Sequence, residues 1–288
     1  MNEAVRHFTS ENIKFPPRKK NTHKGHYGKL AIIAGSSGLT GAAILACRAA
    51  LACGAGLITL YHPPGLETIF ETTLIEVMTR TFVPDDVDCL SDILNSDGIL
   101  IGPGIGKSRW AMDTMTAIVE SEYQKNIIYD ADALNLLAEN THLLKKIQNA
   151  ILTPHIGEFA RLTGKSITEI ETQPVEILKE YCLKYRVNVL LKNHFCLYSD
   201  GYTTYLIEGG NDGLATGGTG DVLAGMILSF VTQTASITGH SELEQTIPSA
   251  VKYLYTIAET IETKYYTHAI TPTKIIEHLF RKTTHPPH

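Results

Sequence analysis

Residues 30–61 of the chain read LAIIAGSSGLTGAAILACRAALACGAGLITLY. The apolar run 30–34 stops at a turn of glycine and serine at 35–38, which is typical of a buried strand before a tight turn. The alanine-rich segment 41–53 predicts a helix, and the apolar run 57–61 predicts a second strand. Because strand, turn, helix and strand follow in this order, we expect a βαβ unit and therefore a parallel sheet.

Short apolar runs that end in glycine or polar residues recur along the chain. They cover residues 98–101, 126–129, 150–153 and 187–191, and the residues directly after them are Gly102-Pro-Gly104, Asp130-Ala-Asp132, Pro154-His155 and Lys192. The carboxyl ends of parallel strands share one edge of the sheet, and ligands bind at that edge. We therefore expect the functional site there.

The last part of the chain predicts helices at residues 222–234, 252–264 and 272–281. Neither a linker nor a sequence repeat divides the chain. We expect an α/β fold with a central, mostly parallel sheet. A single domain over residues 1–288, with a polar lead-in at 1–23, is the simplest organisation.

Composition excludes several classes of function. The chain has 288 residues, 43% of them hydrophobic, and a formal net charge of -5, so it has no basic excess to hold a nucleic acid. The segment 1–20 lacks the apolar centre of a signal peptide. The apolar segment 41–60 is interrupted by Arg48, Gly54 and Gly56, so a helix and a buried strand explain it better than a membrane span. The five scattered cysteines include no Cys-x-x-Cys pair, which favours a reducing, cytoplasmic setting and no zinc site.

The densest candidate motif is Gly217-Gly-Thr-Gly-Asp221, which directly precedes the apolar helix at 222–234. Glycines let backbone N–H groups converge on a phosphate, and the start of a helix adds partial positive charge. Asp221 could then take a proton from a substrate hydroxyl. The alternative is a glycine-rich turn with an aspartate that caps the helix.

The other strand ends carry weaker candidates. His155 and Glu158 could contact a substrate and a magnesium-bound water, but they could also be a helix cap and a surface charge. Asp130 and Asp132 could order magnesium or ribose hydroxyls, or Asp132 could cap a helix. Lys192 could meet a phosphate, although lysines at strand ends are usually solvated. The segment 102–108 fits neither a Walker A loop nor a dinucleotide fingerprint.

Taken together, these motifs resemble the ADP/ATP-dependent NAD(P)H-hydrate dehydratases of the ribokinase-like superfamily. The matching segments occur in the family's order, and they are Lys24-Gly-His-Tyr-Gly-Lys29, Gly35-Ser36 with Gly41-Ala-Ala43, Gly102-Pro-Gly104, Asp130-Ala-Asp-Ala-Leu-Asn135, Thr153-Pro-His155 with Gly157-Glu158, and Gly217-Gly-Thr-Gly-Asp221. The resemblance implies a three-layer α/β/α sandwich. It also implies dehydration of the S epimer of NADH or NADPH hydrate, with ADP or ATP as co-substrate, Mg2+ as cofactor, and AMP and phosphate as products when ADP is used.

The resemblance also implies roles for individual residues. Asp221 matches the catalytic position, where we expect a general base. The residues that match the hydrate site are Ala42, Gly104, His155 and Asp221. Those expected at the adenine nucleotide site are Lys192, Asn193, His194, Phe195, Cys196, Gly218, Thr219 and Gly220. Glu158 lies where the wider superfamily has a glutamate tied to magnesium.

The sequence departs from the family pattern after Lys192, where Asn193 replaces the usual glycine, so the choice between ADP and ATP stays open. Two other functions also stay open: a ribokinase-like kinase for a vitamin precursor, and a catalytically silent nucleotide-binding regulator. The family predicts a homotetramer or homodimer. The segment before Lys24 is too short for the epimerase domain that many bacteria fuse to the dehydratase, so we expect a separate epimerase.

Overall fold

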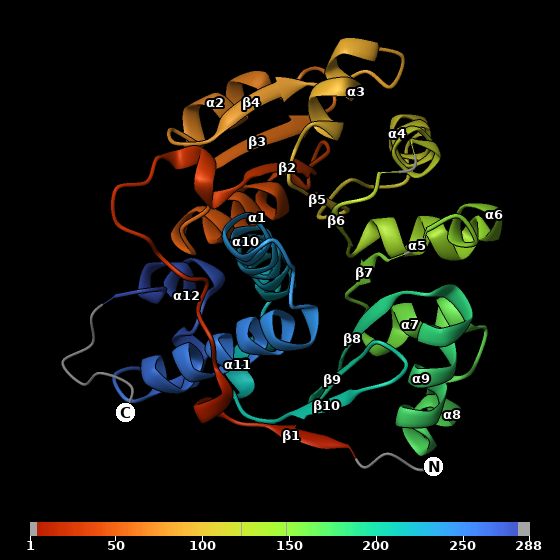
Figure 1. The fold of residues 1–288 in the computed structure, drawn as a ribbon, viewed down its shortest axis with the longest axis vertical. Helices are drawn as coiled ribbons and strands as arrows, with labels where there is room; N and C mark the ends of the chain where they lie inside the picture. Colours follow the sequence, from red (N-terminus) through yellow and green to blue (C-terminus); the bar gives the residue numbers. More distant parts are fainter. Residues whose placement is uncertain (1–4, 122, 148, 282–288) are drawn as a thin grey trace.

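One ten-stranded sheet forms the centre of the protein in a computed structural model, which describes residues 5–121, 123–147 and 149–281 (Figure 1). The strand order is β1-β10-β9-β8-β7-β6-β5-β2-β3-β4. The strands are β1 Arg6–Phe8, β2 Lys29–Ile33, β3 Leu57–His62, β4 Met78–Thr81, β5 Gly98–Ile101, β6 Asn126–Tyr129, β7 Ile151–Leu152, β8 Asn188–Lys192, β9 Cys196–Ser199 and β10 Thr204–Ile207. Only β9 runs antiparallel to its neighbours, so the expectation of a mostly parallel sheet is confirmed.

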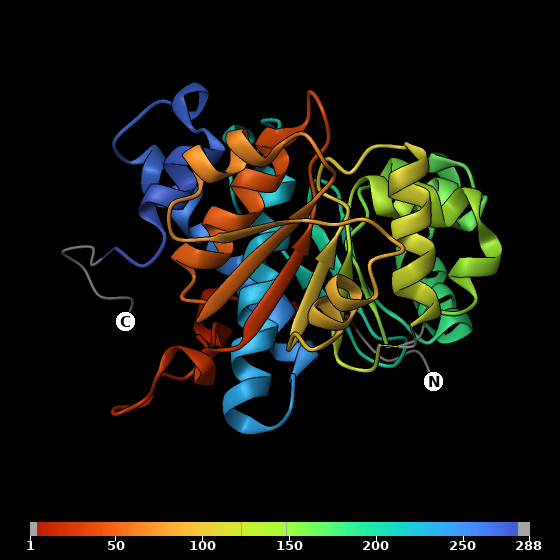
Figure 2. The same ribbon diagram turned by 90° about the horizontal axis from the view of Figure 1, so that it is seen from above.

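Helices cover both faces of the sheet, as Figure 2 shows from above. The helices are α1 Thr40–Ala52, α2 Glu67–Thr73, α3 Val87–Leu94, α4 Arg109–Glu120, α5 Asp132–Glu139, α6 Thr141–Leu144, α7 Ile156–Thr163, α8 Ile167–Thr172, α9 Pro174–Tyr185, α10 Thr219–Thr238, α11 Leu243–Glu262 and α12 Pro272–His278. One core cluster joins the sheet to α1, α2, α10, α11 and α12. The other joins it to the helices α3 to α9. This is the expected three-layer α/β/α sandwich.

Strand β2 illustrates why both faces of the sheet are buried. Leu30 and Ile32 belong to one core cluster, whereas Ala31 and Ile33 belong to the other. Successive side chains of a strand point to opposite faces, so an uninterrupted apolar run places apolar side chains in both layers. The continuous run at 30–34 therefore produces a central strand.

Helix α10 is the core helix of the first layer. It is long and apolar enough to span a membrane by length and composition, but most of its residues are buried in the protein. It crosses α1 so closely that a Cβ on Gly225 would lie 2.2 Å from the carbonyl oxygen of Ala46. The close packing of α10 fixes its first turn relative to the sheet.

The structure differs from the sequence-based expectations in several elements, and strands β4, β9 and β10 had no predicted counterpart. The lead-in contains β1, a short strand of polar composition that pairs with β10 and so completes one edge of the sheet. Strand β7 has only two residues instead of four. Helix α11 begins at Leu243 rather than at residue 252, because Pro248 is accommodated within its second turn. The ends of the predicted domain, residues 1–4 and 282–288, lie outside the described residues.

Candidate active site

The site lies where the strand order reverses, at the carboxyl ends of β2 and β5. These strands are neighbours although β3 and β4 separate them in the chain. The two loops that follow are joined, because Gly35 N donates to Pro103 O at 2.9 Å and Ser36 Oγ donates to Gly104 O at 2.9 Å. A Cβ on Gly104 would lie 3.0 Å from Ala42 Cβ. The structure thus brings together Ala42 and Gly104, two small residues expected at the hydrate site.

The loop after β5 is fixed from the neighbouring strand β6. Gly102 has a φ of +132°, and a Cβ there would lie 1.8 Å from the carbonyl oxygen of Asp130, so only glycine fits. Gly106 N donates to Asp132 Oδ2 at 2.9 Å. Asp132 therefore fastens this loop rather than capping its own helix, in which no side-chain cap bond is found.

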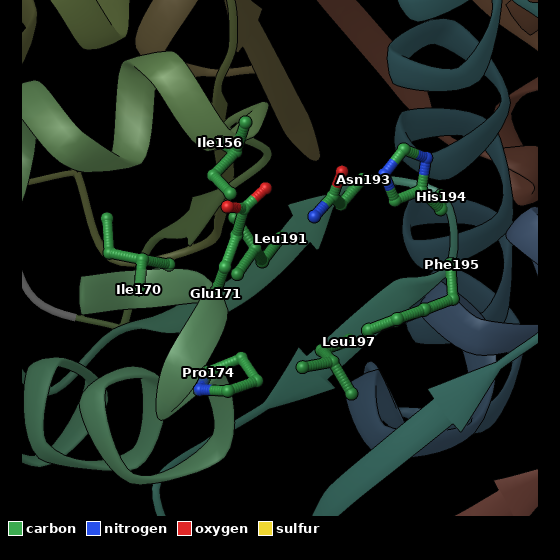
Figure 3. A pocket seen from close by; sticks show the side chains of 9 residues that line it. All are labelled: Ile156, Ile170, Glu171, Pro174, Leu191, Asn193, His194, Phe195 and Leu197. Atoms are coloured by element: carbon green, nitrogen blue, oxygen red, sulfur yellow. The ribbon is translucent and has the colours of Figure 1, made fainter. Parts of the chain in front are cut away.

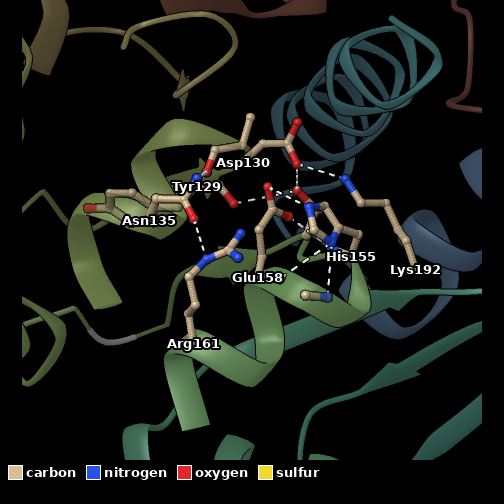
Figure 4. A network of polar contacts seen from close by, with 10 residues as sticks. Tyr129, Asp130, Asn135, His155, Glu158, Arg161 and Lys192 are labelled. Atoms are coloured by element: carbon tan, nitrogen blue, oxygen red, sulfur yellow. Dashed lines mark hydrogen bonds and ion pairs between the residues drawn. The ribbon is translucent and has the colours of Figure 1, made fainter. Parts of the chain in front are cut away.

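A buried ion pair occupies the centre of the site (Figure 4). Asp130 Oδ1 accepts from Lys192 Nζ at 2.9 Å and from Thr153 Oγ1 at 2.6 Å. The side chain of Asp130 is 2% exposed and that of Lys192 is 20% exposed. Burial lowers the pKa of Lys192, but the charges of Asp130 and Glu158 outweigh it and raise the pKa overall. Lys192 is therefore protonated at neutral pH, and it is not a solvated lysine.

The first turn of α10 has the geometry of an anion site. Gly218 is its N-cap, with a φ of +97°. The N–H groups of Gly218, Gly220 and Asp221 donate no backbone hydrogen bond within the described part of the chain. A Cβ on Gly220 would lie 3.6 Å from Lys192 Nζ. Free N–H groups at the start of a long helix, with an ammonium group beside them, attract phosphate.

Asp221 lies on this first turn and is partly buried. Burial raises the pKa of its carboxyl group to about 7, and the nearby charge of Asp130 adds to the rise while Lys192 opposes it. A carboxylate with a pKa near neutrality can accept a proton from a hydroxyl group at physiological pH. This environment favours the catalytic interpretation over a simple helix cap.

His155 and Glu158 form a capping box at the start of α7. His155 Nδ1 accepts from the N–H groups of Gly157 and Glu158, and Glu158 Oε2 accepts from His155 N at 2.9 Å. The imidazole proton is then on Nε2, and burial lowers the pKa of the ring. The capping role considered from the sequence is thus present, and His155 Nε2 is a hydrogen-bond donor.

The donor set fits a magnesium ion that is bound mainly through nucleotide phosphates. The described residues contain no cluster of three or more metal-binding side chains. Magnesium keeps several waters and often takes only one or two carboxylates in addition to phosphates. Glu158 is such a carboxylate: it is buried, and burial raises its pKa to about 7 while Lys192 lowers it. Glu158 could hold a magnesium-bound water once phosphates are present.

The expected nucleotide loop is the turn between β8 and β9, closed by a bond from Asn193 N to Phe195 O. Asn193, His194 and Phe195 line a mainly apolar cavity of about 230 Å³ on the side of α7, α8 and α9 (Figure 3). Cys196 is buried, and its Sγ accepts from Tyr255 Oη at 3.1 Å. The thiol therefore points into the core, so the backbone of Cys196, and not its side chain, could contact a ligand.

Sequence reasoning gave no role to Thr153, Asn135 and Arg161. Thr153 Oγ1 bonds Asp130, and Arg161 Nε donates to Asn135 Oδ1 at 2.8 Å. One signal was available, since Arg161 follows Glu158 by three residues on a predicted helix and so shares its face. The Thr153 bond depends on adjacent strand ends and could not be found without the sheet order.

Comparisons with known proteins identify the family to which the chain belongs. A family model for NAD(P)H-hydrate dehydratase matches residues 30–281. The chain is 32% identical over 273 residues to the ADP-dependent (S)-NAD(P)H-hydrate dehydratase of Staphylococcus aureus, and the match covers 94% of each chain. It is 36% identical over 223 residues to the bifunctional NAD(P)H-hydrate repair enzyme Nnr of Coxiella burnetii. That match covers 77% of this chain and 44% of the Coxiella protein, so the chain spans less than half of that relative's length.

Two solved structures share the fold over almost the whole chain. The ADP/ATP-dependent NAD(P)H-hydrate dehydratase of Bacillus subtilis, co-crystallised with ATP and Mg2+, has a TM-score of 0.78 at 25% identity, covering 97% of both chains. A ribokinase-like superfamily protein of Enterococcus faecalis has a TM-score of 0.83 at 26% identity, covering 96% of this chain and 94% of that one. The ribokinase-like fold expected from the sequence is confirmed.

Proposed function

The chain belongs to the NAD(P)H-hydrate dehydratase family, and from this premise we propose that it is an ADP-dependent hydro-lyase that repairs nicotinamide nucleotides. It removes water from the S epimer of NADH or NADPH hydrate and consumes ADP, which becomes AMP and phosphate. The observation that carries the proposal is the Asp221 carboxyl group, whose pKa burial raises to about 7, beside free N–H groups at the start of α10.

Phosphoryl transfer explains why a dehydration needs a nucleotide. Hydroxide is a poor leaving group and phosphate is a good one. Asp221 accepts the proton of the hydroxyl group at C6 of the hydrated ring, and the hydroxyl oxygen attacks the β-phosphorus of ADP, so that AMP leaves. The lone pair of the ring nitrogen then expels phosphate from C6. Loss of a proton from C5 restores the C5–C6 double bond of NADH or NADPH.

The first turn of α10 suits the transferred phosphoryl group. Its free N–H groups at Gly218 and Gly220 can donate to phosphoryl oxygens as negative charge develops there. Thr219 adds a buried hydroxyl group for which no partner is found among the described residues. Lys192 supplies a positive charge on the same side, since it lies beside Gly220. These contacts support the proposal that the segment 218–220 and Lys192 bind the nucleotide phosphates.

The hydrated ring is proposed to bind against Ala42 and Gly104, where the small residues leave room for the ring close to the backbone. His155 faces the same edge of the sheet and can donate from Nε2 to a substrate oxygen. Asp221 completes this set. The residues therefore come from the first turn of α1, the loop after β5, the end of β7 and the first turn of α10, around the point where the strand order reverses.

Magnesium bound to the nucleotide would supply positive charge that neutralises the phosphates during transfer. We propose that Glu158 orients this ion through a water molecule. The loop from Asn193 to Cys196 is proposed to contact the adenine nucleotide, the thiol of Cys196 excepted. Asn193, His194 and Phe195 make this loop bulkier than the one usual in the family. Whether ATP can replace ADP as the phosphoryl donor is therefore to be tested.

Further features of the protein follow from the family. We propose a single catalytic domain, a homotetramer or homodimer, and an epimerase that supplies the S epimer. A cytoplasmic location suits the five cysteines, all of which are free and buried.

A recovery assay tests the proposed function. Purified protein is mixed with the S epimer of NADH or NADPH hydrate, Mg2+ and either ADP or ATP, and the absorbance of the reduced nicotinamide is followed. We expect recovery with ADP and a stoichiometric release of AMP and phosphate, and recovery that is about 100-fold slower or more with the Asp221→Asn variant. The proposal fails if neither nucleotide restores the absorbance in the presence of wild-type protein, which would favour a kinase or a silent nucleotide-binding protein.

A further inference from the structure

We propose that Arg161 binds a phosphate group of the dinucleotide hydrate and so anchors the tail of the substrate while the ring is held near His155. This inference rests on the proposed function, because it takes NADH or NADPH hydrate as the ligand. These molecules carry a pyrophosphate, and NADPH hydrate carries a third phosphate on a ribose. The proposal adds a substrate-binding residue to the small residues that receive the ring.

Arg161 is exposed, and its side chain makes one hydrogen bond among the described residues. It lies on α7, three residues after Glu158, and its Nε donates to Asn135 Oδ1 on α5 at 2.8 Å. Figure 4 shows the guanidinium group between Asn135 and Glu158. A Cβ on Gly157 would lie 3.9 Å from Arg161 Nη1, so the group lies along the first turn of α7, beside His155.

The positive charge of Arg161 is not neutralised by a carboxylate within the described ranges of the chain. Two other cations near this edge are paired, Lys192 with Asp130 and Lys107 with Glu139. Arg161 is instead oriented by a neutral amide, and its two terminal nitrogens have no hydrogen-bond partner among the described residues. Its charge acts on the site, because it adds to the lowering of the His155 pKa by burial and opposes the rise that burial causes in the pKa of Glu158.

The geometry of the side chain suits a phosphate better than a purely structural role. A bond at Nε fixes the plane of the guanidinium group and leaves both Nη atoms free for a bidentate contact with an anion. The guanidinium group lies along the first turn of α7 beside His155, so a phosphate of a ligand whose ring lies beside His155 could reach it. The alternative is that Arg161 only joins α5 to α7. In that case, a negative charge at position 135, in place of the neutral amide of Asn135, should not affect binding of the substrate.

Two variants separate these roles. Arg161→Gln removes the charge. Asn135→Asp keeps the arginine but gives it a carboxylate partner, which strengthens the link between α5 and α7 while neutralising the charge. Arg186→Gln is the matched control. Arg186 is an exposed arginine just before β8, so it lies at the amino ends of the strands, away from the proposed site. For each protein we would measure KM for NADH hydrate, NADPH hydrate and ADP, the Kd for NADPH by fluorescence, and Tm.

We expect both site variants to raise KM for hydrate and the Kd for NADPH about tenfold or more, as loss of a hydrogen bond to a charged group does. KM for ADP and the control should stay within about twofold of wild type. Equal effects on the two hydrates would assign Arg161 to the pyrophosphate, and an effect on NADPH hydrate alone would assign it to the ribose phosphate. The inference is overturned if only KM for ADP rises, or if Asn135→Asp binds NADPH normally. Absence of turnover by wild type with either nucleotide would instead refute the proposed function, and the inference would fall with it.

Discussion

Lys192 Nζ lies 2.9 Å from Asp130 Oδ1, although the two residues end strands β8 and β6, which are separated in the sheet by β7. The pair spans the end of β7, whose following residue, Thr153, donates to the same oxygen of Asp130. The ammonium group thus has a carboxylate on one side and the start of α10 on the other. A phosphate bound at α10 would give Lys192 a further anionic neighbour in addition to Asp130 and Glu158.

Asp130→Asn should therefore damage both the fold and the nucleotide site. Removing one partner of a buried ion pair leaves the other charge uncompensated, and we expect a loss of about 3 kcal/mol in the free energy of unfolding. Without Asp130, burial lowers the pKa of Lys192, so its attraction for phosphate weakens. Urea unfolding and KM for ADP measure the two effects.

The double variant Asp130→Asn with Lys192→Met is the control for this pair. Since it leaves no unpaired buried charge, it should recover much of the stability lost in Asp130→Asn. It should still have a raised KM for ADP, because the positive charge beside α10 is gone. Normal KM for ADP in the double variant would show that Lys192 does not act on the nucleotide.

Asp221→Asn should separate stability from activity. Burial raises the pKa of Asp221 in the folded state, so the protonated form favours folding below the unfolded pKa of about 4, and this contribution is lost as pH rises through about 7. The asparagine amide of the variant stays uncharged, so it keeps this contribution to stability when the pH rises. We expect kcat to fall about 100-fold or more and Tm at pH 8 to rise by about 2 °C or more, measured by the recovery assay and by calorimetry. A lower Tm at pH 8 would contradict the assigned environment.

The pH dependence of catalysis should show the same group. A general base must be unprotonated, so kcat/KM should fall tenfold per pH unit on the acid side of a pKa near 7 and level off above about pH 8. Lys192 stays charged over this range because its pKa is raised. A profile that stays flat down to pH 5 would exclude Asp221 as the base.

Two glycines at the edge of the site should respond differently to alanine. Gly102→Ala would place a Cβ 1.8 Å from the carbonyl oxygen of Asp130 at a φ of +132°, so it should lower Tm and activity together. Gly217→Ala meets no atom within 4 Å, and it should keep the wild-type Tm. Thermal unfolding of the two variants tests whether the loop after β5 is as tightly fixed as the geometry indicates.

The order of strands and helices could be predicted because apolar runs and glycine turns are local signals. The apolar run at 30–34 predicted a buried strand. The turn that begins at Gly35 indicated the carboxyl end of this strand, where the site was expected. Strand β1 was missed because Arg6 and His7 are polar, and the strand exists only through pairing with β10. Strands β4, β9 and β10 were not predicted either. Helix α11 begins nine residues before the predicted start, and Pro248 lies inside it.

Candidate site residues could be chosen from the sequence because they follow strand ends. The residues that these side chains contact could not be predicted from the sequence. The bond from Asp130 to Lys192 depends on the sheet order, and the contact of Ala42 with Gly104 depends on the crossing of two loops. The neutral partner of Arg161 depends on the packing of α5 against α7. These relationships are tertiary, and no local pattern encodes them.

An isotope measurement determines whether the C6 hydroxyl group of the hydrate receives the phosphoryl group of ADP. The hydrate is prepared with oxygen-18 in its C6 hydroxyl group, incubated with the protein, Mg2+ and ADP, and the released phosphate is examined by mass spectrometry. Transfer of the β-phosphoryl group to that hydroxyl group predicts one labelled oxygen in each phosphate that accompanies a restored NADH. Restored NADH with unlabelled phosphate would contradict it, because the hydroxyl group would then leave as water without ever carrying phosphorus.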